Sequence, residues 1–278
     1  MQLNLTNYAR HPSESFAPWA WRGLRFAWMQ FDGNARRQTE LIYGGNFEVI
    51  HSAPYPPRVQ YGPEGALLDF STNRYTYLSF GQRAEYCPTD QISVVCRVLV
   101  TSELAANQVL AAKGTPLSTH DWMIARRTTN AYEFAIVNTG DTKTSTQYQG
   151  ARYVGGVFPR MVTFVLTYDG SRLKGYGDGV LFYDMAATGQ IRNTAGYEIS
   201  LGRSAGSSGR FGYSKLLQIY DRSLSAEEIC YLSHLPYDFL RRREVQPYWV
   251  LSGVPDGVFN PFEGSVFTSM RFRSSSIG

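Results

Sequence analysis

The sequence has few charged residues, few cysteines and no long apolar run. Charged residues account for 18% of its 278 residues and the formal net charge is +4, so a nucleic-acid-binding surface is not expected. The three cysteines, Cys87, Cys96 and Cys230, are an odd number without a close pair, which predicts neither a disulfide framework nor a zinc site. No stretch reaches the roughly 18 apolar residues of a membrane-spanning helix.

The first residues also lack the features of a secretory signal. Met1–Asn7 contains neither a basic segment nor an apolar stretch. We therefore expect a protein that is made and kept soluble in the cytoplasm, or that leaves the cell when the cell lyses. No membrane partner is expected.

The residues that are abundant favour β-structure. Aromatic residues make up 14% of the chain, and 26 Gly and 13 Pro accompany them. This composition is typical of short strands joined by tight turns. The segment Ile92–Val100 alternates, with Ile92, Val94 and Cys96 on one face of the expected strand. Cys96 is therefore expected in the core, and we expect the same of Cys230.

Two Asp-Gly pairs interrupt the most regular part of the chain. They are Asp169-Gly170 and Asp178-Gly179, and they separate the β-rich runs 161–168, 172–177 and 180–183. Such pairs supply the positive φ angles that type I′ hairpin turns need. The pattern predicts three antiparallel strands in succession, with a type I′ turn at each pair.

The residues at the start of one segment specify a short helix. Ser225 can cap this helix, and Glu228, three residues later, completes a capping box. The expected helix lies near residues 226–234. Its predicted apolar stripe consists of Ile229, Leu232 and Leu235.

Seven segments between residues 23 and 240 follow one another in an informative order. They are Gly23–Trp28, Gly65–Phe70, Gln108–Gly114, Val162–Gly170, Lys174–Gly179, Ile199–Gly202 and Ile219–Ile229. With these segments the chain resembles the laminin-G-like, concanavalin A-like lectin/glucanase family. The resemblance implies an all-β, two-sheet antiparallel jelly-roll sandwich with one short helix. The proline- and aromatic-containing segments on either side look like arms, so we expect three parts: an N-terminal arm (1–22), a jelly-roll domain (23–241) and a C-terminal arm (242–278).

The resemblance specifies the fold more closely than the function, because this fold hosts lectins, glucanases and structural modules. Glucanases of this fold carry carboxylates in the spacing Glu-x-Asp-x-x-Glu, which the sequence does not contain. Glu228 is expected to cap the helix, and Asp169 and Asp178 are expected in turns. We therefore expect no catalytic residue, and a glycan-active hydrolase is the disfavoured alternative.

No cofactor or metal is expected either. Relatives bind calcium through acidic residues in loops. The segment Phe211–Leu216 corresponds to a strand that is acidic in many relatives, yet it contains no acidic residue. A full set of oxygen ligands for calcium cannot be assigned to this sequence.

Sugar binding needs exposed aromatic rings that stack on a pyranose and polar side chains that bind its hydroxyl groups. The candidates on expected loops and strand ends are Asp121, Trp122, Asn130, Asn138 and Tyr148. For each of them the alternative is ordinary packing or a turn.

The missing export signal bears on the biological setting. Lectin-like members of the family usually act outside cells, whereas a virus particle assembles in the cytoplasm and is released by lysis. The segments Leu224–Ile229 and Leu235–Phe239 are similar to the end of laminin-G-like domains in tailed-phage particle proteins. We therefore predict a non-enzymatic virion structural protein, a capsid decoration or surface protein. The alternative is a carbohydrate-binding adhesin or fibre domain that recognises host-surface glycans.

The two arms suggest how such a protein would be attached. Extended arms can hold neighbouring subunits, and aromatic and Arg side chains dominate interface energetics. The expected partners are other virion proteins, namely the major capsid protein and copies of the chain itself. The expected anchors are Trp19, Trp21, Arg241, Arg242, Arg243, Trp249, Phe259 and Phe262.

Overall fold

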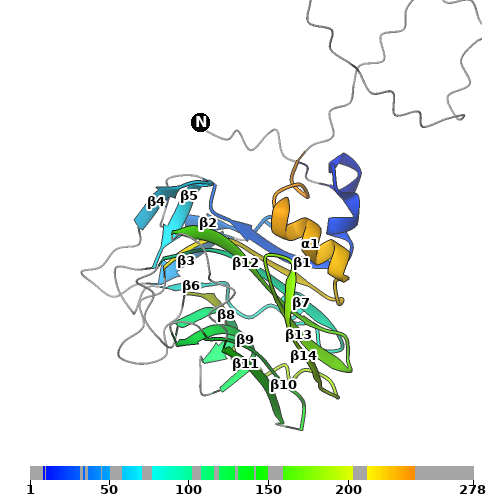
Figure 1. Cartoon of the computed structure of the whole chain (residues 1–278). Helices are drawn as coiled ribbons and strands as arrows, with labels where there is room; N and C mark the ends of the chain where they lie inside the picture. Colours follow the sequence, from blue (N-terminus) through cyan, green and yellow to red (C-terminus); the bar gives the residue numbers. More distant parts are fainter. Residues whose placement is uncertain are drawn as a thin grey trace, which may run out of the picture. The chain divides into compact units, whose positions relative to one another are not determined.

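Two antiparallel β-sheets lie face to face in the computed structural model of the chain (Figure 1). The first sheet has the order β14 (Val180–Ala186), β13 (Arg172–Gly177), β12 (Arg160–Tyr168), β7 (Ile92–Val100), β16 (Tyr213–Tyr220), β5 (Gly65–Asp69) and β4 (Arg58–Gly62), and β1 (Leu24–Met29) also pairs with β16. The second sheet has the order β11 (Lys143–Gln149), β10 (Ala131–Val137), β9 (Thr119–Thr128), β8 (Gln108–Thr115), β15 (Ile199–Leu201), β6 (Tyr77–Ser79), β3 (Asn46–Ile50) and β2 (Arg37–Thr39).

The structure describes most of the chain up to residue 241, and all described residues belong to one unit within Met1–Arg243. The described residues are 9, 11–31, 34, 37–44, 46–50, 58–70, 77–101, 108–115, 119–128, 131–140, 142–149, 159–202 and 212–241.

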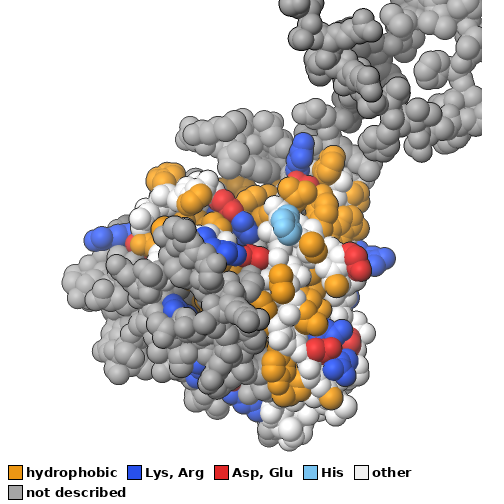
Figure 2. All heavy atoms as spheres, viewed as in Figure 1, with side chains coloured by type: hydrophobic (Ala, Val, Ile, Leu, Met, Phe, Trp, Pro, Cys, Tyr) orange, Lys and Arg blue, Asp and Glu red, His pale blue; other side chains and the backbone are white. Residues whose placement is uncertain are grey.

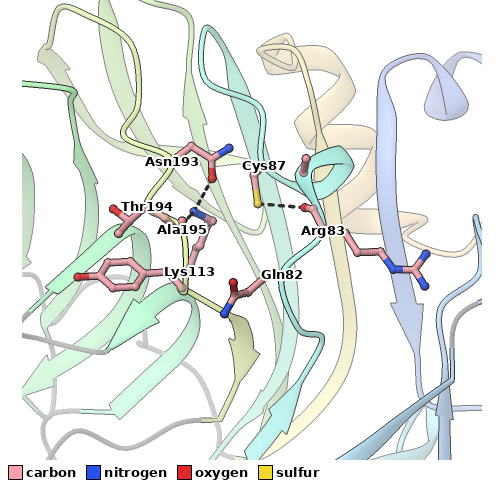
Figure 3. Close-up of a pocket in the computed structure, with 9 residues that line it drawn as sticks. Gln82, Arg83, Cys87, Lys113, Asn193, Thr194 and Ala195 are labelled. Atoms are coloured by element: carbon pink, nitrogen blue, oxygen red, sulfur yellow. Dashed lines mark hydrogen bonds between the residues drawn. The ribbon is translucent and has the colours of Figure 1, made fainter.

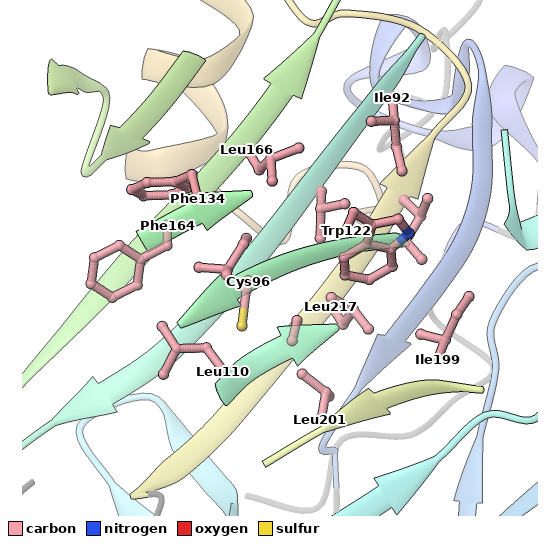
Figure 4. Close-up of a cluster of buried hydrophobic side chains, with 14 of the residues drawn as sticks. Ile92, Cys96, Leu110, Trp122, Phe134, Phe164, Leu166, Ile199, Leu201 and Leu217 are labelled. Carbon is pink, nitrogen blue, oxygen red and sulfur yellow. The ribbon is translucent and has the colours of Figure 1, made fainter. Parts of the chain in front are cut away.

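The main core lies between the two sheets (Figure 4). Ile92, Val94 and Cys96 of β7 are 0% exposed and pack in one cluster with Trp122 and Phe134 of the second sheet. Burying each large apolar side chain contributes about 1.5–3 kcal/mol. The predicted alternation in this strand and the predicted core position of Cys96 are both confirmed.

A second apolar cluster covers the outer face of the first sheet. Val95 of β7 and Val165 of β12 pack there with Ile229 and Leu232 of the helix α1 (Ala226–His234). Before β1, Ala17 and Ala20 belong to the same cluster, and Trp19 and Trp21 pack against it. Both faces of β7 are therefore covered, which explains why each of its residues is buried.

Helix α1 begins and ends where the sequence predicts. The hydroxyl of Ser225 accepts from the Glu228 N–H at 3.2 Å, and the Glu228 carboxylate accepts from the Ser225 N–H at 2.9 Å. Two predictions near this helix are wrong. Cys230 is exposed, since one residue after Ile229 the helix has turned by about 100°. Leu235 is 46% exposed, because it is the C-cap and has left the helical conformation.

No helix in the described ranges is long and apolar enough to cross a membrane.

The two Asp-Gly pairs join three successive antiparallel strands, β12, β13 and β14, as predicted, but they form different turns. Asp178 and Gly179 have φ angles of +46° and +83°, which agrees with a type I′ turn. At the other pair only Gly170 has a positive φ angle, so the type I′ prediction is wrong there. The Asp169 carboxylate accepts from the N–H groups of Ser171 and Arg172 at 2.8 Å, and these bonds stabilise a longer turn.

Candidate binding site

A bulge in the second sheet places Asp121 at the centre of a polar cluster. The register between β8 and β9 shifts between Lys113 and Gly114, and a bulge of this kind redirects a side chain. Asp121 is 0% exposed. Its carboxylate accepts from Nζ of Lys113, from Nε of Arg192 at 3.0 Å, and from N and Oγ1 of Thr194, each at 2.8 Å.

The carboxyl group of Asp121 favours its ionised form. Burial opposes the ionisation of Asp121, but the hydrogen bonds from Lys113 and Thr194 outweigh it and hold the pKa of the carboxyl below its usual value. The carboxylate therefore fixes the loop that contains Arg192 and Thr194 to the edge of the sandwich.

A pocket of about 270 Å³ opens beside this cluster (Figure 3). Two loops form it, one after β6 and one before β15. They meet because these strands are neighbours: the Phe80 N–H donates to the Ile199 carbonyl oxygen at 2.8 Å, and the Ile199 N–H donates to the Gly81 carbonyl oxygen at 3.1 Å. The lining residues are Gln82, Arg83, Ala84, Cys87, Lys113, Asn193, Thr194, Ala195 and Tyr197.

Two amide side chains of the pocket have a defined orientation. Nζ of Lys113 lies 2.7 Å from Asn193, and because an ammonium group only donates, the atom that faces it is Oδ1. The Gly196 N–H lies 2.9 Å from Gln82, so Oε1 of Gln82 faces this donor. Each amide therefore turns its NH₂ group away from the partner that holds it.

Two cationic residues line the pocket, and no acidic residue does. Lys113 is paired with Asp121, and the side chain of Arg83 points away from the other lining residues, with its guanidinium carbon 5.9 Å from the centre of the Tyr86 ring (Figure 3).

Tyr197 adds an aromatic wall, and the guanidinium carbon of Arg192 lies 5.9 Å from the centre of the Tyr197 ring. Burial raises the pKa of the Cys87 thiol to about 11, despite the nearby charge of Lys113. Because the thiolate is the nucleophilic form, this raised pKa disfavours Cys87 as a nucleophile at neutral pH.

The structure separates the residues predicted to bind sugar. Trp122 is only 1% exposed and lies between the sheets, so its ring presents no face to a ligand, which agrees with the alternative of ordinary packing. Asp121 has its oxygens occupied by the cluster described above. Asn138 holds a turn instead: its Oδ1 accepts from the Thr142 N–H at 2.9 Å, and its Nδ2 donates to the Thr188 carbonyl oxygen at 3.1 Å.

Two further sugar-binding candidates cannot be assigned to a site. Asn130 lies outside the described residues. Tyr148 is paired with Tyr132 in the register of β11 and β10, but its side chain is not described. For both residues sugar binding stays a prediction.

The described anchors lie where the two ends of the domain meet. Nε1 of Trp21 donates to the Phe239 carbonyl oxygen at 2.7 Å, and the ring of Trp19 lies 5.2 Å from that of Tyr231 in α1. Arg241 has an exposed side chain that approaches the Asp238 carboxylate at 3.9 Å. Arg242, Arg243, Trp249, Phe259 and Phe262 lie outside the described residues.

Backbone hydrogen bonds join the N-terminal segment to the end of the domain. The Ala9 N–H donates to the Leu240 carbonyl oxygen at 2.9 Å, and the Phe16 N–H donates to the Arg241 carbonyl oxygen at 2.8 Å. The ring of Phe16 lies 4.9 Å from the Arg241 guanidinium carbon and is 50% exposed. Ala9 therefore lies beside Leu240, and Phe16 beside Arg241.

The second sheet also buries an acid that could suggest catalysis. Glu133 of β10 is 0% exposed, and its carboxylate pairs with Arg127 and, at 2.9 Å, with Lys143. Burial opposes its ionisation, but these cations outweigh burial and lower the pKa of Glu133. Asp121 and Glu133 thus both favour the ionised form, whereas a glycosidase needs one carboxyl that stays protonated. Within the described ranges no three His, Cys, Asp or Glu side chains converge as metal ligands would.

Sequence reasoning missed the residues that line the pocket. Gln82, Arg83, Asn193 and Tyr197 stand in two loops without periodicity, 110 residues apart along the chain between Arg83 and Asn193. Only the pairing of β6 with β15 brings these loops together. The one signal in the sequence is the polar composition of the two loops.

Residues 71–230 match the model of the laminin-G-type family described as the concanavalin A-like lectin/glucanases superfamily. This match covers more than half of the chain and agrees with the resemblance found in the sequence. No curated protein matches the chain in sequence.

Solved structures with the same fold include binding domains of bacterial toxins. The binding domain of Paraclostridial Mosquitocidal Protein 1 is 13% identical, with a TM-score of 0.57 over 77% of this chain and 52% of that one. The botulinum neurotoxin serotype G binding domain is 12% identical, with a TM-score of 0.54 over 77% and 51% of the two chains. The receptor binding domain of botulinum neurotoxin D is 13% identical, with a TM-score of 0.56 over 76% of this chain and 52% of that one.

The chain spans about half the length of these solved structures, and at this level of identity the likeness concerns the fold alone. The prediction of an all-β, two-sheet jelly roll with one short helix is confirmed.

Proposed function

Because the chain belongs to the concanavalin A-like lectin/glucanases superfamily, we propose that it is a non-enzymatic structural protein of a tailed-phage particle, a capsid decoration or surface protein. In this proposal the residues around its two chain ends attach the domain to the particle. The partners are the major capsid protein and further copies of the chain.

The observation that carries the proposal is the meeting of the two ends. The segment around Phe16 and the segment that ends at Arg241 are hydrogen-bonded to each other. Two arms that leave a domain at one place can bind the same neighbouring subunit, while the rest of the sandwich makes no contact with it. Aromatic and Arg side chains, such as Phe16 and Arg241, are the types that contribute most at interfaces.

Apolar side chains on the surface support the same interpretation. Figure 2 shows hydrophobic side chains on the side of the molecule that carries α1 and β14. Exposed apolar residues here are Val180 at 57% and Leu181 at 47% in β14, and Leu235 at 46%, which directly follows α1. Surface apolar groups of this size are suited to a contact with another protein.

The lowered pKa values of Asp121 and Glu133 argue against either residue as the general acid of a glycosidase. Each acid is held in its ionised form by cations, so neither supplies the proton that a glycosidic leaving group requires.

The test is the incorporation of variants into particles. In the full-length protein, Phe16→Ala removes the exposed ring beside Arg241, and Tyr61→Ala, which removes a ring that is 72% exposed on β4, is the matched control. We expect Phe16→Ala to lower the copy number per particle, measured by quantitative mass spectrometry and located by cryo-electron microscopy. Tyr61→Ala should leave it unchanged.

Deleting residues 244–278 should abolish incorporation, while circular dichroism of the purified variant still shows a cooperatively folded β-protein. Wild-type incorporation of both the deletion and Phe16→Ala would reject the proposal.

A second candidate function is the recognition of host-surface glycans. The pocket beside Lys113 favours it, because this pocket combines an aromatic wall with amide side chains. Binding of the purified chain to a glycan array, with release by free sugar, tests this candidate separately from incorporation into particles.

A further inference from the structure

We propose that Cys230 and His234 of α1 form half of a zinc site, which a second copy of the chain completes. The juxtaposition that carries the inference is an exposed thiol and an exposed imidazole one turn apart on the same helix. The inference goes beyond the proposed function and does not depend on it.

The two side chains are neighbours on the surface of the helix. Residues four apart lie on one face of a helix, and Sγ of Cys230 lies 3.9 Å from Nδ1 of His234. Two ligands at this helical spacing are a known way to hold a zinc ion. Because both side chains are exposed, rotation about their χ angles can direct the thiol and the imidazole at one ion.

The imidazole of His234 has the hydrogen-bond pattern of a metal ligand. Its Nδ1 lies 2.8 Å from the Cys230 carbonyl oxygen, and because a carbonyl oxygen only accepts, Nδ1 carries the ring proton. Nε2 is then the nitrogen with a free lone pair. Histidines that bind metals usually donate their other N–H to a carboxylate or a backbone carbonyl, which fixes the ring. His234 can therefore bind zinc through Nε2 and keep its bond to the helix.

One chain alone leaves such an ion two ligands short. Cys87 and Cys96 are buried, and within the described ranges no third His, Cys, Asp or Glu side chain joins the pair. A structural zinc site has four ligands, and two cysteines with two histidines are one of the usual sets. A two-fold axis beside α1 supplies the same cysteine and histidine a second time. On binding, each thiol forms a Zn–S bond and releases its proton to solvent.

The surface around the pair suits a contact between two copies. A Cβ atom added to Gly179 would lie 3.6 Å from Sγ of Cys230, so the turn between β13 and β14 adjoins the thiol. Val180, the next residue of this turn, is 57% exposed, and Leu235, which directly follows His234, is 46% exposed. Apolar side chains thus flank the two ligands on both sides, and a second copy would cover them.

The charges at this place do not oppose the contact. The carboxylate of Asp178, in the same turn, is paired with Arg160 and accepts from the Thr163 N–H at 2.8 Å. A zinc ion bound by two thiolates and two neutral imidazoles has no net charge. The completed site therefore adds no uncompensated charge between the copies.

The experiment is a titration of the purified full-length chain with ZnCl₂ after a chelator has removed bound metal. A chromogenic chelator reports free zinc, and sedimentation velocity reports the mass of the protein. We expect one zinc ion per two chains, half-saturation at about 1 µM free zinc or below, and a dimer that excess chelator dissociates. Co²⁺ in place of Zn²⁺ should give the visible absorption of a tetrahedral thiolate site.

Variants of the two ligands locate the site. Cys230→Ser and His234→Gln change exposed side chains, so without zinc the fold should be that of the wild type. Each should weaken zinc binding by about 100-fold or more, since losing only the hydrogen-bond partner of a ligand already costs about 10–100-fold. His11→Gln, at an exposed histidine far from α1 in sequence, is the matched control and should bind zinc as the wild type does.

A further variant tests the contact without touching the ligands. Val180→Lys places a charge on the apolar rim and should weaken zinc-dependent dimerisation by about tenfold or more, because the charge must be buried against the second copy. Tyr61→Lys makes the same change at a 72% exposed ring of β4 and should have no effect.

Undetectable zinc binding at about 100 µM, or binding that Cys230→Ser and His234→Gln leave intact, would overturn the proposal. Saturation at one zinc ion per monomeric chain would overturn it too, since the second copy would not complete the site. A dimer that Val180→Lys leaves as tight as the wild type would overturn the proposed contact. Particle incorporation is measured independently of all these outcomes.

Discussion

Nζ of Lys215 donates to the carbonyl oxygen of Gln30 at 2.6 Å, in a site where only 3% of the lysine is exposed. Nζ of Lys215 also donates to the Ala66 carbonyl oxygen at 3.0 Å. Burial lowers the pKa of Lys215 to about 8, and the charge of Glu64 offsets only part of this effect. The lysine thus joins β16 to β1 and β5 while its charge is held in an unfavourable environment.

This environment predicts that Lys215 makes stability increase with pH. The pKa is about 8 in the folded chain and 10.5 for an ordinary lysine, so the unfolded state binds more protons between these values. Between pH 7.5 and 9.5 the lysine should add about 2 kcal/mol to the free energy of unfolding.

The measurement for Lys215 is urea unfolding of the wild type and of Lys215→Met at both pH values. Cys87 and Cys96, whose pKa values are raised by burial, act in the opposite direction in both proteins, so only the difference between the two proteins reports on Lys215. A difference in stability that does not change with pH would contradict the expected role.

His120 is expected to make the domain sensitive to acid. It is 2% exposed, and neither ring nitrogen has a hydrogen-bond partner in the described part of the chain. Burial, helped by the charge of Lys143, lowers the pKa of His120 to about 4, compared with 6.5 for an ordinary histidine. The unfolded state therefore takes up the proton first, and stability falls as the pH drops through this range.

Between pH 7 and pH 5, His120 should lower the free energy of unfolding by about 2 kcal/mol. His120→Leu should abolish most of it, as measured by urea unfolding at the two pH values. His234→Gln, at an exposed residue of α1, should behave as the wild type does. If His120→Leu loses as much stability on acidification as the wild type, the histidine is not the cause.

Local sequence patterns predicted those strands and helices that depend only on residues close together in the chain. The alternation of Ile92–Val100 and the capping box of Ser225 and Glu228 each need only neighbouring residues, and both are confirmed. The strands β2, β3, β4 and β11 were not predicted. For example, β4 is Arg58–Gly62, whose residues are exposed or half-buried, so no apolar alternation marks it.

The positions of the side chains at the candidate site depend on strand register and on the pairing of strands that are far apart in the chain. For Trp122 the sequence does not tell which face of β9 meets the core, because the bulge at Asp121 shifts the register. Gln82 and Asn193 meet only because β6 and β15 are neighbours in the second sheet. The pairing of distant strands is set by the whole fold, and a pattern within one segment does not contain it.

The buried ion pairs of Asp121 should contribute far more to the free energy of unfolding than an exposed pair does. Asp121→Asn leaves Lys113, which is 2% exposed, without its carboxylate and weakens the bond to Arg192. We expect a loss of about 3–5 kcal/mol in the free energy of unfolding, since an uncompensated charge stays buried. Asp184→Asn breaks the exposed pair with Arg172 and should cost less than about 1 kcal/mol.

Urea unfolding of both aspartate variants at neutral pH measures the contrast. Equal losses for the two variants would mean that the cluster around Asp121 does not stabilise the loop as described.

The turn between β13 and β14 offers a test of the contact between this hairpin and α1. Gly179 has a φ angle of +83°, and a Cβ atom added to it would lie 3.0 Å from the Cα atom of Cys230. Gly65, with a φ angle of +85°, has nothing within 4 Å of such an atom. Gly65→Ala should therefore cost only the backbone strain, about 1–2 kcal/mol. Gly179→Ala should cost about 1–3 kcal/mol more, because α1 must also shift away from the hairpin.

Thermal and urea unfolding of Gly65→Ala and Gly179→Ala would measure this difference. The reactivity of the exposed Cys230 toward a thiol reagent gives a second readout, since a displaced helix should change it only in Gly179→Ala. Equal destabilisation of the two variants, with unchanged Cys230 reactivity, would show that the hairpin and α1 are not in the close contact that the structure describes. A larger loss in Gly179→Ala would mean that the turn helps to set the position of α1, the helix on which Trp19 packs.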